Sequence, residues 1–316
     1  MGDTVPMPLP SSPALRAAAA VGLLGAACIA YGTGYEVRSY RLRRVEVPGA
    51  LPTGADPLRV LHLSDLHLVP GQRAKRDWVR ALAALEPDLV VDTGDNLAHP
   101  EAVPYLLDAL GPLLERPGLF VLGSNDYFGP RLKNPARYLI PGDRRRLHGP
   151  DLPWKDLVAG LEAEGWADLG NRRAALEVGG LRIEARGVDD PHIHRDAYAE
   201  VAGPAEPVDG RAPDLVLGVT HAPYHRVTDA MAADGCSLIL AGHTHGGQLC
   251  VPWLGALVTN CDLAPGRAKG LSPHAFGADG SVSAWLHVSA GLGTSPYAPI
   301  RFACPPEATL LTLLPR

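Results

Sequence analysis

The sequence has few cysteines, and none of them are closely spaced. Its 316 residues include five cysteines and no C-x-x-C pair. An odd number of distant cysteines argues against a disulfide framework and against a thiolate metal site. We therefore expect them to be small buried hydrophobic residues, and any metal ligands to be histidines and carboxylates. The cysteines are Cys28, Cys236, Cys250, Cys261 and Cys304.

A surplus of positive charge is also absent. The formal net charge is -5 at pH 7. Proteins that bind nucleic acid through its phosphates usually carry a basic surplus, so no nucleic-acid partner is expected. An apolar fraction of 46% with 20% charged residues is typical of a globular chain. No long linker and no internal repeat follow Arg44, which predicts one domain over residues 45–316.

One long uncharged run lies near the N-terminus. Residues 1–13 are rich in proline and serine and are expected to be disordered. No charged residue occurs from Ala17 to Tyr31, and the longer segment 14–35 would be sufficient for a membrane-spanning helix. A single membrane anchor is the preferred interpretation. A cleaved signal peptide and a buried helix are the alternatives.

Positive charges flank this run unevenly. Arg16 lies before its apolar part, and four arginines follow it. Membrane spans carry excess positive charge on their cytoplasmic side, so the main domain is expected in the cytoplasm. A signal peptide would reverse that assignment. The arginines that follow are Arg38, Arg41, Arg43 and Arg44.

The rest of the chain alternates between strand and helix patterns. Glycines 179 and 180 join two apolar runs as a hairpin. Early βαβ units followed by hairpin-like strands predict two sheets with helices outside them. Strands are expected at 58–63, 89–93, 119–122, 175–178, 181–185, 215–219, 238–241, 285–289 and 309–314, and helices at 76–85, 102–114 and 154–164.

Polar residues with metal-binding side chains follow three early strands. Asp65 and His67 follow the first strand in a D-x-H pattern, which on an extended backbone would put both side chains on the same side. Asp95 follows the second strand after a glycine, and Asn125 follows the third. Ends of strands are where α/β folds place their functional sites.

Two later strands end in histidines. His221 follows strand 215–219, and the segment Gly242–Gln248, which contains His243 and His245, follows strand 238–241. Each of these positions alone has an ordinary explanation as a turn or structural residue. Together they supply two aspartates, one asparagine and four histidines. Such ligands suit Mn, Fe, Zn or Co and suit calcium poorly.

The order D-x-H, G-D, N-D, H and G-H-x-H resembles the calcineurin-like metallophosphoesterase superfamily. The resemblance runs from about Arg59 to Leu314. The block G-H-T-H-G-G-Q and the C-terminal segment around Pro299-Ile300-Arg301-Phe302 are similar to the membrane-linked bacterial branch of that superfamily. The family fold is a four-layer α/β/β/α sandwich of two mixed sheets flanked by helices.

The resemblance also implies two divalent metal ions and a set of ligands. Three residues would hold the first ion, three would hold the second, and one would bridge both. The first group is Asp65, His67 and His245, the second is Asn125, His221 and His243, and the bridging residue is Asp95.

The family resemblance implies phosphoester hydrolysis. Two cations ~3.5–4 Å apart would clamp the phosphoryl oxygens, and a hydroxide bridging them would attack phosphorus. We expect a phosphodiester or pyrophosphate substrate, membrane-associated and lipid- or nucleotide-linked. A phosphomonoesterase and a non-catalytic metal-binding scaffold are the alternatives.

One position departs from the family pattern G-N-H followed by Asp or Glu. This chain reads Gly123-Ser124-Asn125-Asp126. Aligning Asn125 with the ligand puts Asp126 where the family has the histidine that protonates the leaving group; the other alignment makes Ser124 the ligand. A carboxyl with an ordinary pKa of ~3.9 is a poor acid at neutral pH, so good leaving groups are expected. Asp95, His221 and Asp126 are the candidate catalytic residues.

Two further polar segments are candidates for substrate binding. Residues 130–150 are rich in arginine, and Arg131 in this segment could hold a phosphate or an anionic lipid headgroup. Residues 187–196 contain His192 and His194, which could contact substrate or supply an acid. A solvated loop is the alternative for both segments.

Overall fold

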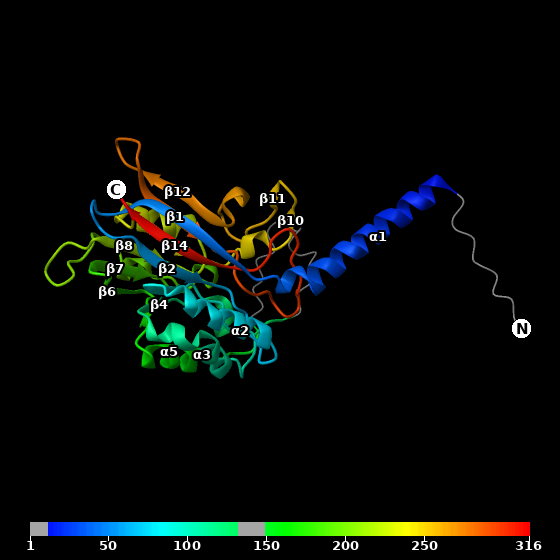
Figure 1. Ribbon diagram of the computed structural model, residues 1–316, viewed down its shortest axis with the longest axis horizontal. Coiled ribbons are helices and arrows are strands. Elements are labelled where there is room, and N and C mark those ends of the chain that lie inside the picture. Colours follow the sequence, from blue (N-terminus) through cyan, green and yellow to red (C-terminus); the bar gives the residue numbers. More distant parts are fainter. Residues whose placement is uncertain (1–11, 132–148) are drawn as a thin grey trace, which may run out of the picture.

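The computed structural model describes residues 12–131 and 149–316. Most of the N-terminal segment expected to be disordered, and most of the arginine-rich segment 130–150, lie outside the described residues. The described residues form two six-stranded sheets, several flanking helices and a long helix at the N-terminus (Figure 1).

The first sheet has the strand order β1-β14-β2-β3-β4-β5. Strands β2 to β5 are parallel, and β14 runs antiparallel to β2. The parallel strands are short and apolar, as is usual where both faces of a sheet are covered. The strands are β1 (Arg41–Leu51), β2 (Leu58–Leu63), β3 (Leu89–Asp92), β4 (Gly118–Phe120), β5 (Ala167–Asp168) and β14 (Glu307–Pro315).

The second sheet has the strand order β12-β13-β9-β8-β7-β6. Its four middle strands are parallel, and each edge strand is antiparallel to its neighbour. The strands are β6 (Arg172–Val178), β7 (Leu181–Gly187), β8 (Leu215–Val219), β9 (Leu238–Ala241), β12 (Gly270–Phe276) and β13 (Val282–Val288). A separate short hairpin joins β10 (Cys250–Val251) to β11 (Gly255–Ala256).

The two sheets pack face to face with helices outside them. One apolar cluster fills the space between the sheets, from Val60 and Val91 of the first to Leu217 and Leu240 of the second. A second cluster lies between the first sheet and three helices, and a third lies under α6. These contacts give the four layers that the family resemblance implied. The helices are α2 (Arg73–Ala81), α3 (Val103–Leu110), α4 (Ser124–Tyr127), α5 (Trp154–Ala163) and α6 (His225–Ala233).

The predicted fold class is confirmed, and three predicted strands match residue for residue: β2, β8 and β9. Strands β1 and β12 and helix α6 were not predicted. Strand β1 is an edge strand with exposed arginines at positions 41, 43 and 44, so its sequence lacks the apolar run of a central strand. Helices 76–85 and 102–114 instead end early and continue as 3-10 turns.

Helix α1 (Pro13–Gly34) projects from the folded body (Figure 1). Residues Pro13–Arg38 have a mean hydropathy of 1.7, enough in length and composition to cross a membrane, and the apolar window of that segment has no buried residue. Among the described residues, the C-terminal end of α1 and the 3-10 turn Glu36–Arg38 after it contact the body. There Glu36 accepts hydrogen bonds from the backbone N–H groups of Ala303 and Cys304.

Candidate metal centre

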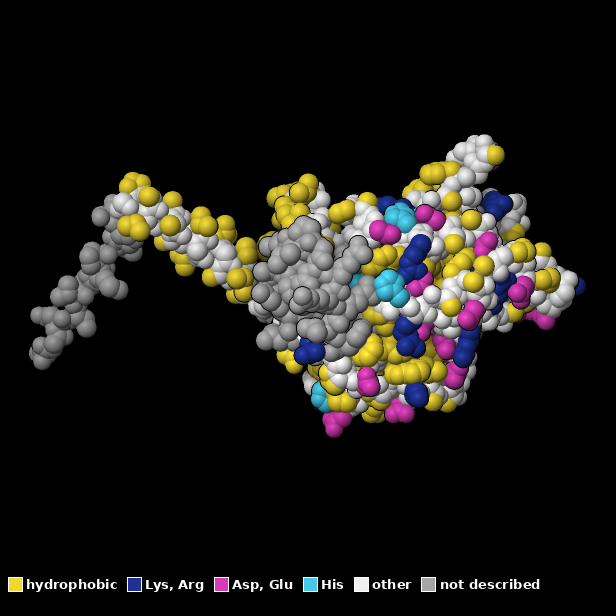
Figure 2. Space-filling model, turned by 180° about the vertical axis from the view of Figure 1, so that it is seen from behind, with side chains coloured by type: hydrophobic (Ala, Val, Ile, Leu, Met, Phe, Trp, Pro, Cys, Tyr) yellow, Lys and Arg dark blue, Asp and Glu magenta, His cyan; other side chains and the backbone are white. Residues whose placement is uncertain are grey.

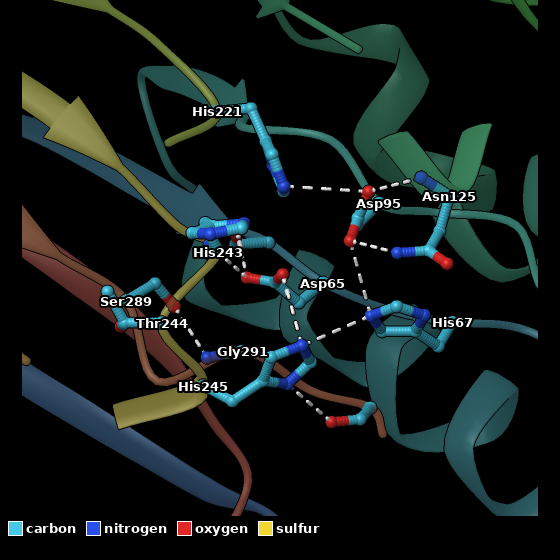
Figure 3. Close-up of polar contacts among 12 residues, drawn as sticks. Asp65, His67, Asp95, Asn125, His221, His243, Thr244, His245, Ser289 and Gly291 are labelled. Carbon is cyan, nitrogen blue, oxygen red and sulfur yellow. Dashed lines mark hydrogen bonds and ion pairs between the residues drawn. The ribbon is translucent and has the colours of Figure 1, made fainter. Parts of the chain in front are cut away.

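Residues that follow β2, β3, β8 and β9 converge at one edge of the two sheets (Figure 3). Ligand atoms of four of them lie within 4.8 Å of one another. Because the carboxyl ends of parallel strands meet at the same edge, side chains distant in the sequence become neighbours. The four residues are Asp65, His67, Asp95 and His245.

The first group of side chains points its donor atoms at a common centre. His67 Nε2 lies 3.3 Å from His245 Nε2 and 3.5 Å from Asp95 Oδ2. His245 Nε2 lies 3.6 Å from Asp65 Oδ1, a buried oxygen without a hydrogen-bond partner in the described part of the chain. Burial lowers the pKa of His67 to about 4 and that of His245 to about 3, which keeps both imidazoles neutral. Neutral imidazoles facing an unpartnered carboxylate oxygen fit a divalent cation.

The second group surrounds the other side of Asp95. His221 Nε2 lies 3.5 Å from Asp95 Oδ1, and the side-chain amide of Asn125 donates to Asp95 Oδ2 over 2.7 Å. The ring of His243 lies 5.3 Å from that of His221, centre to centre. Asp95 therefore lies between the two groups, with one oxygen toward His67 and the other toward His221.

Hydrogen bonds fix the orientation of these ligands. His221 Nδ1 donates to the carbonyl oxygen of Thr93 over 2.7 Å, and His245 Nδ1 donates to that of Gly293 over 3.1 Å. Ser64 donates its hydroxyl to Asp65 Oδ2 over 2.6 Å. A histidine that donates from Nδ1 presents the lone pair of Nε2, which is the form that binds metals.

The backbone at the ligands differs from the extended form that the D-x-H spacing suggested. Asp65, His67, Asp95, His243 and His245 all have left-handed backbones, with φ between 42° and 70°. The expectation of an extended backbone at Asp65 and His67 is therefore wrong. Residues other than glycine rarely adopt this conformation, and it concentrates at functional sites.

The charges at the centre indicate where a cation belongs. Burial alone would raise the pKa of Asp95, but the imidazole of His221 holds it well below its usual range. Burial alone would lower the pKa of His221, but Asp95 raises it well above its usual value. The carboxylate thus draws positive charge to this position.

Asp126 lies against the backbone of the Asp95 loop. Its carboxylate is fully buried, and four backbone N–H groups donate to it at 2.8–3.1 Å. Burial raises the pKa of this carboxyl to about 8, and these donors act in the opposite direction. In the structure this carboxyl holds the Asp95 loop through these hydrogen bonds, and its part in catalysis stays a prediction. The donors belong to Gly123, Asp95, Asn96 and Leu97.

The three candidate substrate-binding residues differ in position. The His192 ring lies 4.4 Å from that of His243, centre to centre, and His192 Nδ1 is 3.0 Å from the Tyr224 hydroxyl. His194 is exposed at the end of the same turn. Within the described residues, His192 contacts the centre and His194 does not. Arg131 is exposed at the edge of the described segment.

Sequence reasoning missed two residues that support the centre. Asp190 is buried, its Oδ1 accepts from the backbone N–H of His192 over 2.7 Å, and its Oδ2 has no hydrogen-bond partner among the described residues. Arg301 is buried and donates to the carbonyl oxygens of Ala290 and Gly293, each over 2.7 Å. Both lie in segments whose polar or motif character was visible in the sequence.

Comparisons with known proteins agree with this geometry. A model of the calcineurin-like phosphoesterase family matches residues 58–247, a range that includes all seven ligand candidates. A bovine transmembrane protein with a metallophosphoesterase domain is 31% identical over 213 residues, 65% of this chain, and the match spans only 44% of that protein's length. The phosphodiesterase YaeI of Escherichia coli is 26% identical over 266 residues, covering 82% of this chain and 83% of that protein.

Another relative covers nearly the whole chain. An uncharacterized metallophosphoesterase of Bacillus subtilis is 25% identical over 315 residues, covering 92% of this chain and 94% of its own length. Among solved structures, a dimetal phosphatase from Danio rerio is 12% identical, covers 75% of this chain and 88% of its own, and gives a TM-score of 0.38. That score is too low to support a residue-by-residue comparison.

Proposed function

Because the chain belongs to the calcineurin-like phosphoesterase family and is a metallophosphoesterase, we propose that it hydrolyses a phosphodiester or pyrophosphate at a binuclear metal centre. The position of Asp95 carries the proposal. One of its oxygens faces His67 and the other faces His221, so one carboxylate is shared by two sets of donors. A bridging carboxylate is what two cations in one site require.

The side chains divide into two sets around this bridge. We assign one ion, of Mn, Fe, Zn or Co, to each set. When bound, the two cations would supply the charge that lowers the pKa of a water molecule and stabilises negative charge on phosphoryl oxygens. The first set is Asp65, His67 and His245, and the second is Asn125, His221 and His243.

The protein's own residues hold this arrangement rigid. The carbonyl oxygens of Thr93 and Gly293 fix the rings of His221 and His245. Asp126 fixes the Asp95 loop through backbone N–H groups and is assigned a positioning role. His192, beside His243, is the residue best placed to contact substrate at the second ion. Arg131 and His194 remain candidates at the rim.

The preference for diesters follows from what surrounds the centre. Asp126 is buried and both of its oxygens accept hydrogen bonds from the backbone, so neither oxygen is directed at a leaving group. A substrate whose leaving group departs without protonation is therefore favoured, as in activated diesters and pyrophosphates. The E. coli relative is named a phosphodiesterase, which supports this choice.

Membrane attachment through α1 completes the proposal. The bovine relative and one from Danio rerio are named transmembrane proteins. We assign the catalytic domain to the cytoplasm because arginines 38, 41, 43 and 44 follow the helix. A C-terminal alkaline phosphatase fusion, which is active only outside the cytoplasm, should then be inactive; an active fusion would reverse the orientation.

A pair of p-nitrophenyl substrates tests the proposed activity. The full chain in detergent with added manganese should hydrolyse bis-(p-nitrophenyl) phosphate faster than p-nitrophenyl phosphate. The substitution Asp95→Asn should abolish that hydrolysis because it weakens the bridge. His225→Ala, at a half-buried position on α6, is the control and should keep full activity. Faster monoester cleavage would favour a phosphomonoesterase, and no cleavage of either ester would favour the scaffold.

A further inference from the structure

An uncharged, apolar hairpin projects beside the metal centre. It comprises residues 249–258 and includes β10 and β11. Trp253 at its turn is fully exposed, and Leu254 is 74% exposed. In Figure 2 a raised cluster of hydrophobic side chains stands beside the point where α1 leaves the body. Exposed apolar clusters of this kind mark interaction surfaces. The other exposed members are Leu249, Val251, Leu257 and Val258.

The hairpin belongs to a larger region without charge. No Asp, Glu, Lys or Arg occurs in residues 246–261, and none occurs in residues 291–300, where Tyr297 is 55% exposed. These segments are joined: the Gln248 side chain donates to the carbonyl oxygens of Ala298 and Ile300, each over 3.0 Å. Cys250 also donates its backbone N–H to Phe302.

The same region is attached to the end of the apolar helix. The Tyr31 ring meets the Phe302 ring edge-on at 6.1 Å. A Cβ on Gly32 would lie 2.9 Å from the Ile300 side chain, so only glycine permits this close approach. Helix α1, the uncharged segment 291–300 and the hairpin are therefore joined by direct contacts, partly through Phe302. If α1 spans a bilayer, its C-terminal end holds the hairpin at the membrane surface.

From this arrangement we infer that the hairpin inserts its tip into the lipid interface beside α1, and that the centre acts on a phosphoester whose apolar part stays in the bilayer. The second half of this inference rests on the proposed function. Tryptophan prefers the membrane interface because its ring is apolar and its N–H is polar. Arg38 is exposed just after the span, where it can meet anionic headgroups.

The hairpin is also connected directly to the metal-ligand loop. It begins four residues after His245, and Cys250 Sγ lies 3.2 Å from the carbonyl oxygen of Gly246. Just past its end, the carbonyl oxygen of Asn260 lies 3.4 Å from His243 Nε2. The two ends of the hairpin are thus close to the ligand candidates His245 and His243. When the tip of the hairpin enters the membrane, these connections hold the centre close to the bilayer, where lipid headgroups carry phosphoesters.

Lipid quenching tests the surface without reference to catalysis. The full chain is reconstituted in phosphatidylcholine vesicles with or without brominated acyl chains, and tryptophan fluorescence is measured. Wild type should be quenched by the brominated lipid, and Trp253→Phe should lose most of that quenching. The matched control is Trp285→Phe. Trp285 lies in β13 of the second sheet and its indole N–H donates to the carbonyl oxygen of Pro48 in β1, so this variant should keep the quenching. Equal quenching in wild type and Trp253→Phe would contradict the insertion of the hairpin tip into the lipid interface.

Two matched substrates then test the link to catalysis. Ethyl p-nitrophenyl phosphate is soluble, and hexadecyl p-nitrophenyl phosphate partitions into the vesicles. The double variant Trp253→Ser/Leu254→Ser should lose at least about tenfold in kcat/KM on the hexadecyl ester and nothing on the ethyl ester, because its centre is intact and only membrane contact is weakened. An equal loss on both esters, or no loss on either, would overturn the inference.

The remaining outcomes separate the two proposals. If wild type cleaves neither ester while Trp253 is still quenched, the proposed function fails and the membrane surface stands. If Trp253 is not quenched and the detergent-solubilised chain is a dimer that the double variant dissociates, a second copy covers the hairpin and the lipid surface is wrong.

Discussion

At the scale of single residues, the backbone of the ligands explains how so many of them reach one point. Five ligand candidates have positive φ values, each a cost of about 1 kcal/mol or more for a residue other than glycine. A Cβ on Gly242 would lie 1.9 Å from the Ser64 hydroxyl, so glycine is required where the two loops meet. Tight backbone approach therefore supplies the rigidity that metal ligands need.

The seven ligand candidates could be picked out from the sequence, whereas the contacts of Asp126 could not. Metal-binding side chains after apolar strands are visible as a pattern. The donors to Asp126 include the backbone N–H groups of Asp95 and Asn96, which lie about thirty residues earlier. Any sequence has such N–H groups at every position except proline, so only the folded structure shows where they point.

The substitution Asp126→Asn tests the positioning role. The amide would place an NH2 group against backbone N–H donors, loosen the Asp95 loop and lower metal affinity by roughly 10–100-fold. At saturating manganese, rates on aryl phosphodiesters should fall by a similar factor for every leaving group. A loss confined to leaving groups of high pKa would show that Asp126 acts as a proton donor instead.

At the scale of elements, a buried histidine pair joins the two sheets. His62 on β2 and His287 on β13 share one hydrogen bond, with their Nδ1 atoms 2.9 Å apart. One Nδ1 must donate and the other must accept, so the pair is stable only when at least one ring is neutral. The contact between the sheets gives both histidines a structural role.

This pair predicts a loss of stability in acid. Burial lowers the pKa of His287 to about 3, and burial with the charge of His287 lowers that of His62 well below its ordinary value. Histidine in the unfolded chain has a pKa of ~6.5. Below that pH the unfolded state binds protons at these two positions and the folded state does not. The free energy of unfolding should therefore fall by up to about 1.4 kcal/mol per pH unit for each histidine as pH drops below that value.

Urea unfolding of the full chain in detergent, at pH 7 and pH 5, measures the effect. The double variant His62→Gln/His287→Gln keeps a hydrogen bond between the sheets without a titrating group, so it should lose less stability than wild type between the two pH values. Equal losses would mean that other groups cause the acid sensitivity.

At the scale of the whole molecule, the parallel strands of both sheets direct their carboxyl ends to the same edge. The order of strand and helix patterns along the chain predicted two sheets with helices outside them, and apolar side chains of these strands fill the cluster between the sheets. The edge strands β1 and β12 were not predictable in the same way, because their burial comes from pairing with β14 and β13 and not from an apolar run. The candidate site lies at the ends of the central strands, and the apolar runs of those strands are visible in the sequence.

The central claim is that seven side chains hold two cations around Asp95, and metal content tests it most directly. The purified full chain, saturated with manganese and separated from free metal by gel filtration in detergent, should contain two manganese ions per chain. Asp95→Ala should contain fewer than one, while His225→Ala should keep two. A single ion per wild-type chain, or unchanged content in Asp95→Ala, would contradict the account.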